Sequence, residues 1–200
     1  TALAFMGISP MGLSEVPALA PRKKQAAYDA GCMLMKLYAD DCRPKQLITR
    51  ESMLNAVRAS SASGGSTNAL LHLIAIARES GVDLQLEDFD RISSETPIIC
   101  DLKPGGKYLA SQMEAAGGMR LLAAKLKQAS CLHNTPTVSG LSLFEEAEQA
   151  QETKGQNVIR DVEQAVSQRG SFAILRGNLA PAGAVVKLCG HDRARHRGPA

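Results

Sequence analysis

The chain has 200 residues with a formal net charge of +3, and 44% of its residues are hydrophobic and 22% charged. This composition is typical of a globular protein that can bury a core and hold one or two domains. The small charge and the aromatic content of 4% argue against a nucleic-acid partner, and no apolar run approaches the roughly 18–20 residues that cross a membrane.

The five cysteines do not form a metal or redox motif. They stand at positions 32, 42, 100, 131 and 189, without a CxxC pair and without a histidine at metal-ligand spacing. An odd, unpatterned set of cysteines is typical of reduced thiols. We therefore expect mostly buried thiols, a cytoplasmic protein and no metal bound by this chain.

The four histidines give no evident catalytic group. His72 lies in an apolar stretch and is expected to be a hydrogen-bonded core residue. His133 follows a predicted helix, where a cationic side chain stabilises the C-terminus. His191 and His196 fall in a basic tail and are expected to be exposed. Because no base accompanies a serine and no carboxylate pair is distinctive, the residues alone give no complete active site.

The first part of the chain is predicted to be helical. Residues 1–20 contain two glycines and two prolines, which indicate a helix end followed by an irregular loop. Pro21 suits a first helical position, and apolar residues at helical spacing continue to about Asp41. Thr49 is predicted to cap a second helix, with Glu51 in its first turn.

A glycine loop, SGGSTNALLHL, begins at Ser63 and is followed by an apolar run that ends at Gly81. The pattern predicts a tight loop that leads into a buried helix. Ser66, Thr67 and Asn68 stand at the helix N-terminus, where free N–H groups and hydroxyls favour a carboxylate or phosphate. The same residues suit an ordinary helix cap, and the loop alone leaves both interpretations open.

The remaining elements are predicted from short local signals. Residues 84–91 are predicted to begin a helix whose acidic side chains form a solvated face. Residues 97–102 are predicted to form a buried strand. Residues 103–107 are predicted to form a turn, whose two lysines are solvated or meet an anion. Residues 110–129 form a helix broken at Gly117 and Gly118, and Ser142 opens a helix that continues to about Thr153. Residues 154–156 resemble a linker, and strands follow at residues 172–175 and 184–188, joined by a loop. We therefore expect a domain boundary near residues 154–158.

Three motifs in order resemble one protein family. They are SGGSTNA with LHL (residues 63–69 and 71–73), DLKPGGKY with AGG (residues 101–108 and 116–118), and AILRGNLAP with GAVVK (residues 173–181 and 183–187). Their order and spacing resemble the dihydroxy-acid dehydratase and phosphogluconate dehydratase family over essentially the whole chain. Within the family the chain looks most like the dihydroxy-acid dehydratases of branched-chain amino-acid biosynthesis, with aldonic-acid and phosphogluconate dehydratases as close alternatives.

The resemblance implies a hydro-lyase that converts a 2,3-dihydroxy carboxylate, a small hydroxy acid, into a 2-keto acid. It implies an iron–sulfur cluster, a divalent cation such as Mg²⁺, a serine base and, for the full-length enzyme, a homodimer or higher homo-oligomer. It also implies that the cluster, metal and catalytic residues lie outside these 200 residues, which would then be an internal fragment, inactive alone. For this fragment we expect no catalytic and no metal residues, and Ser66, Thr67 and Asn68 as the substrate-binding residues.

The implied fold is of the α/β class. Residues 1–155 would be the helix-rich second half of a large α/β domain, and residues 156–200 the first strands of a small β-barrel-like domain. The alternative from another functional class is a non-catalytic anion-binding relative of the family. Cluster cysteines and a serine base in the flanking sequence would distinguish the enzyme from that alternative.

Overall fold

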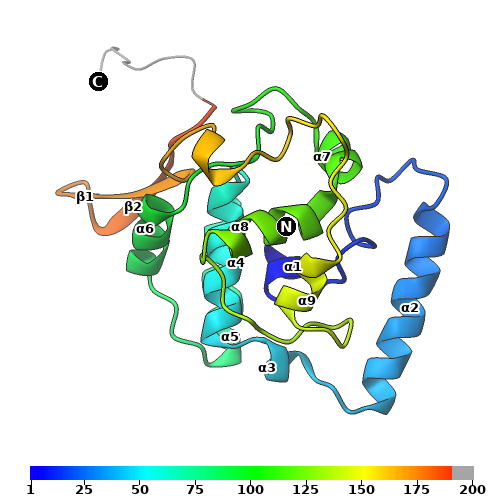
Figure 1. The fold of residues 1–200 in the computed structure, drawn as a ribbon. Coiled ribbons are helices and arrows are strands. Elements are labelled where there is room, and N and C mark those ends of the chain that lie inside the picture. Colours follow the sequence, from blue (N-terminus) through cyan, green and yellow to red (C-terminus); the bar gives the residue numbers. More distant parts are fainter. Residues whose placement is uncertain (191–200) are drawn as a thin grey trace.

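Helix α4 (Arg50–Ala62) lies at the centre of the computed structural model, which describes residues 1–190 (Figure 1). Its first turn is fixed as predicted, because the Thr49 hydroxyl accepts a hydrogen bond from the Ser52 N–H at 3.2 Å. The Ser52 hydroxyl accepts in return from the Thr49 N–H at 2.9 Å. This reciprocal capping satisfies two N–H groups that the helix itself leaves unpaired.

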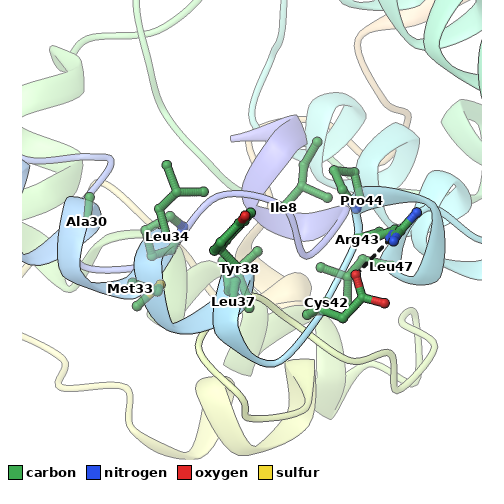
Figure 2. Close-up of a pocket in the computed structure, with 13 residues that line it drawn as sticks. Ile8, Ala30, Met33, Leu34, Leu37, Tyr38, Cys42, Arg43, Pro44 and Leu47 are labelled. Atoms are coloured by element: carbon green, nitrogen blue, oxygen red, sulfur yellow. Dashed lines mark hydrogen bonds and ion pairs between the residues drawn. The ribbon is translucent and has the colours of Figure 1, made fainter.

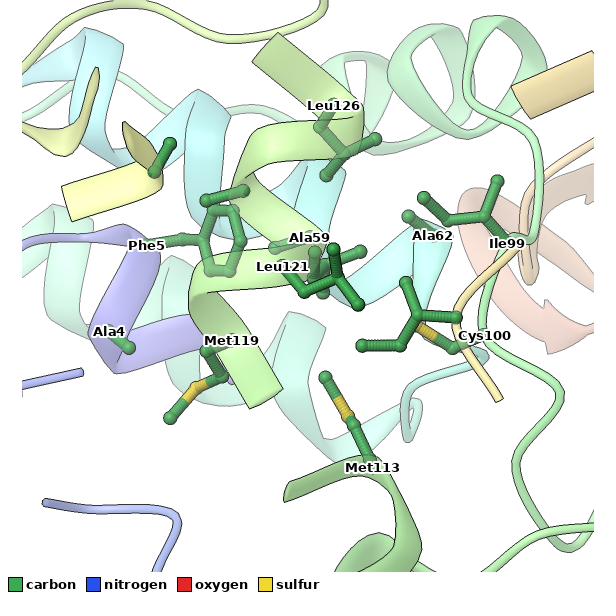
Figure 3. Packing of buried hydrophobic residues seen from close by; sticks show 14 of the residues in the cluster. Ala4, Phe5, Ala59, Ala62, Ile99, Cys100, Met113, Met119, Leu121 and Leu126 are labelled. Carbon is green, nitrogen blue, oxygen red and sulfur yellow. The ribbon is translucent and has the colours of Figure 1, made fainter. Parts of the chain in front are cut away.

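One hydrophobic core lies on the side of α4 that faces α8 (Gly118–Gln128). Leu121 and Leu126 of α8 gather there with Phe5 of α1 (Ala2–Phe5) and with Ala59 and Ala62 of α4 (Figure 3). The small side chains of α4 allow the neighbouring elements to approach its backbone closely. Helix α9 (Leu143–Glu148) packs against α8 and adds Leu143 and Ala147 to the same core, and Ser142 caps α9 as predicted.

A second core lies on the opposite side of α4. Met53 and Val57 of α4 pack there with Leu73 of α5 (Asn68–Ser80) and Phe89 of α6 (Leu86–Glu95). Phe172 of strand β1 (Phe172–Gly177) completes this core and ties the end of the chain to the helices. Because α4 is buried on both sides, it holds the two cores together.

The chain ends in an antiparallel hairpin of β1 and β2 (Ala180–Lys187). The register pairs Ala173 with Val186 and Leu175 with Ala184, and the turn is shorter than the predicted loop. The predicted strands are therefore confirmed as a two-stranded hairpin within residues 1–190, while the predicted barrel is not shown. The expectations for His191 and His196 lie outside the described residues.

Helix α2 (Lys23–Ala39) stands at the edge of the molecule, apart from the other helices (Figure 1). Ala26 is the buried residue on it, and the expected helix from Pro21 to about Asp41 is confirmed apart from its ends. Three other helices complete the described part of the chain. They are α3 (Pro44–Leu47) and the 3-10 helix η1 (Val162–Gln164), which the sequence did not indicate, and α7 (Ala110–Ala116), which precedes the predicted break at Gly117. None of the helices in residues 1–190 is long and apolar enough to cross a membrane.

Two sequence predictions about local structure are wrong. Residues 97–101 are buried and Leu102 is half-buried, but the segment forms isolated bridges instead of a strand, with Ile98 paired to Ser167 and Cys100 to Ile159. The acidic residues of α6 do not all face solvent, because Asp88 is buried. Its carboxylate accepts hydrogen bonds from the Gln85 N–H at 3.0 Å and from Arg50 of α4 at 2.8 Å. Asp88 therefore caps α6 and pairs with Arg50, instead of lying on the predicted solvated face.

Asp88→Ala should lower the free energy of unfolding at neutral pH by roughly 1–2 kcal/mol, because α6 loses its cap. Burial alone would raise the pKa of Asp88, but the hydrogen bonds from Gln85 and Arg50 hold that pKa below its usual value. A depressed folded-state pKa stabilises the protein above the unfolded pKa of about 3.9 and loses this contribution as the pH falls through the folded value. Urea titrations at several pH values should therefore show the difference shrinking below about pH 4. Glu87→Ala is the control, because Glu87 lies on the same turn but only in an exposed ion pair with Arg176. It should change the free energy of unfolding little. Equal losses of stability in the two variants would contradict the role of Asp88.

Candidate functional site

The glycine loop between α4 and α5 folds back tightly on the end of α4. The Gly65 N–H donates a hydrogen bond to the Ser60 carbonyl oxygen at 2.8 Å. A Cβ at Gly65 would lie 2.8 Å from that same oxygen, and Gly64 has φ +66°, where side chains are disfavoured. Both glycines are therefore required by the backbone, which confirms the predicted tight loop.

The three predicted site residues lie together at the start of α5. The Ser66 hydroxyl accepts from the Asn68 N–H at 3.2 Å, so it satisfies one N–H of the first turn. Thr67 is the N-cap residue, but its side chain accepts no capping hydrogen bond within residues 1–190. Ser66 and Asn68 are exposed and Thr67 is half-buried. Of the three side chains, one therefore contributes to capping, and the assignment of all three to a substrate stays a prediction.

The loop borders a cavity of about 580 Å³. Ser60, Ser63 and Ser66 line one wall, and the other walls come from Thr1 to Ala4, Ser9, Ser14, Glu15, Ala110, Met113, Glu114 and Met119. The Glu15 carboxylate accepts from the Gly12 N–H at 3.0 Å and from the Met119 N–H at 2.6 Å, and Glu114 pairs with Arg22. Both acidic groups are thus engaged. The hydroxyls of Ser60 and Ser63 donate to the carbonyl oxygens of Ala56 and Ala59 at 2.8 and 2.7 Å, so these two serines can offer a ligand only acceptor positions.

The other side of the loop meets the second family-like motif and the residues that directly follow the third. A cavity of about 370 Å³ lies between Gly64, the turn at residues 103–107 and the residues after β2. These segments lie close together. A Cβ placed on Gly64 would lie 3.8 Å from the Cys189 Sγ, and a Cβ placed on Gly105 would lie 3.1 Å from the Cys189 Cβ. The structure therefore brings together three segments that are far apart in the sequence.

The turn at residues 103–107 is held by the buried Asp101. Its carboxylate accepts from the Lys107 N–H at 3.1 Å and from the Arg160 guanidinium at 2.8 Å. Its carbonyl oxygen accepts from the N–H groups of Lys107 and Tyr108. Lys103 and Lys107 themselves are exposed, as expected for a solvated turn.

The cysteines do not fit an iron–sulfur cluster or another metal centre. Among residues 1–190, no group of three or more His, Cys, Asp or Glu side chains could hold a metal ion. All five thiols are free; Cys100 is buried, Cys32 is exposed and the others are intermediate, so the expectation of mostly buried thiols is wrong. Burial raises the pKa of Cys100 to about 12, and burial also raises the pKa of Cys189. Both thiols are therefore poor nucleophiles at neutral pH.

Both histidine expectations within the described residues are wrong. His72 is exposed on α5, because Leu70, Leu73 and Ala77 form the buried face of that helix. His133 lies beyond the end of α8, and its backbone groups, rather than its side chain, pair with Asn55 of α4 at 2.9 Å. Neither imidazole is placed at the glycine loop by these contacts.

Sequence reasoning missed the serines that share the cavity wall with Ser66. Ser60 lies in the last turn of α4, Ser63 is the C-cap residue of that helix and Ser66 lies beyond the two glycines. Their common wall therefore depends on the path of the glycine loop, and their spacing in the sequence did not indicate it. The approach of Cys189 to Gly64 and Gly105 had no signal in the sequence either, because it depends on the path of a chain that returns after more than eighty residues.

Comparisons with known proteins find the same family along the whole chain. The profile described as dihydroxy-acid/6-phosphogluconate dehydratase N-terminal matches residues 1–146, and its C-terminal counterpart matches residues 157–200. The chain is 49% identical over 197 residues to the dihydroxy-acid dehydratase of Koribacter versatilis, covering 98% of this chain and 34% of that protein. It is 47% identical over 201 residues to those of Roseiflexus castenholzii and Thermus thermophilus, covering all of this chain and 36% of each relative. The chain therefore spans about a third of the length of the curated relatives that it matches.

Gly106→Ala should destabilise the folded chain by roughly 1–3 kcal/mol through overpacking. A Cβ at this position would lie 2.6 Å from the Asp101 carbonyl oxygen, so the turn would have to open. Gly177→Ala is the matched control, because nothing lies within 4 Å of a Cβ placed there. Urea denaturation of both variants measures the difference, and equal stability of the two would contradict the close packing of the turn on Asp101.

Proposed function

This chain belongs to the dihydroxy-acid/6-phosphogluconate dehydratase family, and we propose that it is part of a cytoplasmic hydro-lyase. The proposed reaction removes water from a 2,3-dihydroxy carboxylate to give a 2-keto acid, as in branched-chain amino-acid biosynthesis. The observation that supports it is the identity of 47–49% to dihydroxy-acid dehydratases over essentially the whole chain. The substrate itself is inferred from these relatives.

The reaction needs groups that this chain does not supply. The proton next to a carboxylate is weakly acidic and hydroxide is a poor leaving group, so a base and a Lewis acid are both required. Residues 1–190 contain no set of side chains that fits a metal ion or cluster. We therefore assign the cluster, a divalent cation such as Mg²⁺ and the base to residues outside this chain.

The part of the reaction assigned to this chain is binding of the substrate. The N-terminal end of α5, a helix of 13 residues, carries a partial positive charge that attracts a carboxylate. The N–H groups of its first three residues already pair with Ser66 and Thr67, so the direct donors to an anion would be side chains. The side chains of Thr67 and Asn68 make no hydrogen bond with residues 1–190, so they are available as donors. Neutral hydroxyl and amide donors can orient an anion without placing an unpaired charge in the site.

Anaerobic reconstitution of the 200-residue chain with iron and sulfide should yield less than one cluster per chain, because its thiols are dispersed. Iron and acid-labile sulfide assays after gel filtration measure the outcome. A variant with all five cysteines replaced by serine gives the background of adventitious iron. A stoichiometric cluster in the native chain alone would show that its cysteines assemble a site after all.

In an active dehydratase that contains this chain, Thr67→Val and Asn68→Ala should each reduce kcat/KM by about tenfold or more while stability stays within about 0.5 kcal/mol. The two side chains make no capping hydrogen bond, so their loss should affect the substrate rather than the helix. Thr49→Val is the matched control, because it removes a real cap and should cost about 1 kcal/mol without changing turnover. Wild-type kinetics in the Thr67 and Asn68 variants would refute the assignment.

Rates with dihydroxy acids that differ in the length of their carbon chain should be compared in the same enzyme. A preference for the short branched substrate supports the dihydroxy-acid reaction, and a preference for sugar acids would assign the enzyme to the other branch of the family.

A further inference from the structure

Arg160 lies beyond the predicted domain boundary, yet its side chain binds a turn of the helical part of the chain. Its guanidinium group donates a hydrogen bond to the Asp101 carboxylate at 2.8 Å. The N-terminal family profile ends at residue 146 and the C-terminal one begins at residue 157. The ion pair therefore connects a residue of the C-terminal profile with the second family-like motif, which begins at Asp101.

Asp101 uses its two carboxylate oxygens for different partners. Oδ1 accepts a hydrogen bond from the Lys107 N–H at 3.1 Å, and Oδ2 accepts the one from Arg160. Asp101 is only 4% exposed, and a carboxylate this buried needs hydrogen bonds and an opposite charge nearby. Within residues 1–190, Arg160 is the cationic side chain that pairs with Asp101. Arg160 thus allows Asp101 to be buried as a carboxylate and bonded to the turn at the same time.

The position of Arg160 is fixed by the main chain on both sides of Ile159. The Arg160 N–H donates to the Ile99 carbonyl oxygen at 2.8 Å, and the Asp101 N–H donates to the Val158 carbonyl oxygen at 2.9 Å. The Ile159 side chain is buried in the core that contains α8. Because this backbone is anchored, the charge-assisted hydrogen bond from Arg160 fixes Asp101 and its turn relative to the core.

The main chain connects Asp101 with the start of the glycine loop. The N–H groups of Ile99 and Cys100, the two residues before Asp101, donate to the Ala62 carbonyl oxygen at 3.0 and 3.2 Å. Ala62 is the last residue of α4, and the loop begins at the next residue, Ser63. A shift of Asp101 would therefore act on the point at which the loop leaves the helix.

The Cys189 side chain provides a second connection, because it lies between the turn and the loop. It lies 3.1 Å, measured at its Cβ, from a Cβ placed on Gly105 of the turn. Its Sγ lies 3.8 Å from a Cβ placed on Gly64 of the loop. All three residues line the cavity of about 370 Å³. A turn that opens would therefore uncover the Cys189 thiol and remove support from the loop.

Loss of Arg160 would open the turn for an electrostatic reason. A buried carboxylate without an opposite charge is strongly unfavourable, so Asp101 would turn toward water or bind a proton. Either change weakens the hydrogen bond that its Oδ1 accepts from the Lys107 N–H.

We propose that Arg160 is a positioning residue of the substrate site. Through Asp101 it fixes the turn at residues 103–107 and, with that turn, the glycine loop that carries Ser66, Thr67 and Asn68. Arg160 itself does not touch the substrate. The identity of the site rests on the proposed function, whereas the link from Arg160 to the loop does not, so the two are tested separately.

The reactivity of Cys189 tests the link without an enzyme assay. Arg160→Gln should raise the rate at which iodoacetamide alkylates Cys189 by about fivefold or more, because the opened turn uncovers the thiol. Peptide mass spectrometry measures each thiol of the 200-residue chain separately. Cys42 is the internal reference, because it is intermediate in exposure, as Cys189 is. Figure 2 shows Cys42 at another cavity, of about 500 Å³, near Pro44 and Leu47, so its rate should stay the same.

Arg120→Gln is the matched control variant. Arg120 pairs with the buried Glu146 at 2.7 Å, and the side-chain exposures of 30% and 1% resemble the 33% and 5% of Arg160 and Asp101. This pair joins α8 to α9 and belongs neither to the turn nor to the glycine loop. Arg120→Gln should therefore lower stability about as much as Arg160→Gln does, but leave the Cys189 rate unchanged.

Asp101→Asn tests the same ion pair if Arg160→Gln does not fold. An amide has one acceptor oxygen, so it cannot accept from both the Lys107 N–H and Arg160. The Arg160 side chain is 33% exposed and can turn to water, so no charge is left buried without a partner. The Cys189 rate should rise in this variant as well.

Steady-state kinetics of an active dehydratase that contains this chain test the effect on the substrate. Arg160→Gln should raise KM by about tenfold or more and change kcat less, because the displaced loop binds substrate while the reacting groups lie outside this chain. Arg160→Lys keeps the charge in a contact that uses one nitrogen, and should return KM to within about threefold of the wild-type value. A loss of stability alone would lower the amount of active enzyme, and so the apparent kcat, without changing KM.

Three results would overturn the proposal: an unchanged Cys189 rate in Arg160→Gln and Asp101→Asn, equal changes of that rate or of KM in Arg120→Gln, or a KM of Arg160→Lys as high as that of Arg160→Gln. A Cys189 rate that rises while KM keeps its wild-type value would refute the role at the substrate site. Failure of the proposed site itself is recognised separately, by wild-type kinetics in Thr67→Val and Asn68→Ala.

Discussion

The last turn of α4 is the constraint on which the candidate site depends. A helix end leaves carbonyl groups without partners inside the helix, and here those groups bind segments from distant parts of the chain. The Ala62 carbonyl oxygen accepts from the N–H groups of Ile99 and Cys100 at 3.0 and 3.2 Å. The Ser60 carbonyl oxygen accepts from Gly65 at 2.8 Å. The glycine loop and the segment that leads to Asp101 are thus positioned by one turn of one helix.

Small side chains make this arrangement possible. Ala56, Ala59 and Ser60 are buried on α4, and each lets a neighbouring element reach the helix backbone. Larger residues there would separate the two cores and move the glycine loop away from the Asp101 turn. The cavities on the two sides of the loop therefore follow from the composition of a helix that does not itself carry reactive groups.

Local features of the fold could be predicted from the sequence, and features that depend on tertiary packing could not. The caps at Thr49 and Ser142 were predictable because a side chain and the N–H group it binds are three residues apart. The exposure of His72 was not, because an apolar helix does not reveal which of its sides meets the core. Residues 97–102 have strand-like composition, yet their partners are single residues of irregular segments.

The site was predictable only in part. The glycine loop was identified from the residues and from the family resemblance, whereas its proximity to Cys189 required the path of the whole chain. The boundary placed between residues 155 and 156 stays a prediction. An ion pair between Asp101 and Arg160 connects the residues on its two sides.

The weak attachment of α2 separates its local stability from that of the rest of the chain. Ala26 is its buried residue, so α2 can unfold while α4, buried on both sides, stays folded. Amide hydrogens of α2 would then exchange through this local opening, and those of α4 only through global unfolding. A partner that covers exposed side chains of α2, such as Tyr28 and Met35, adds its binding free energy to the cost of opening α2 first. A partner at this helix would therefore slow exchange in α2 while exchange in the folded centre stays nearly the same.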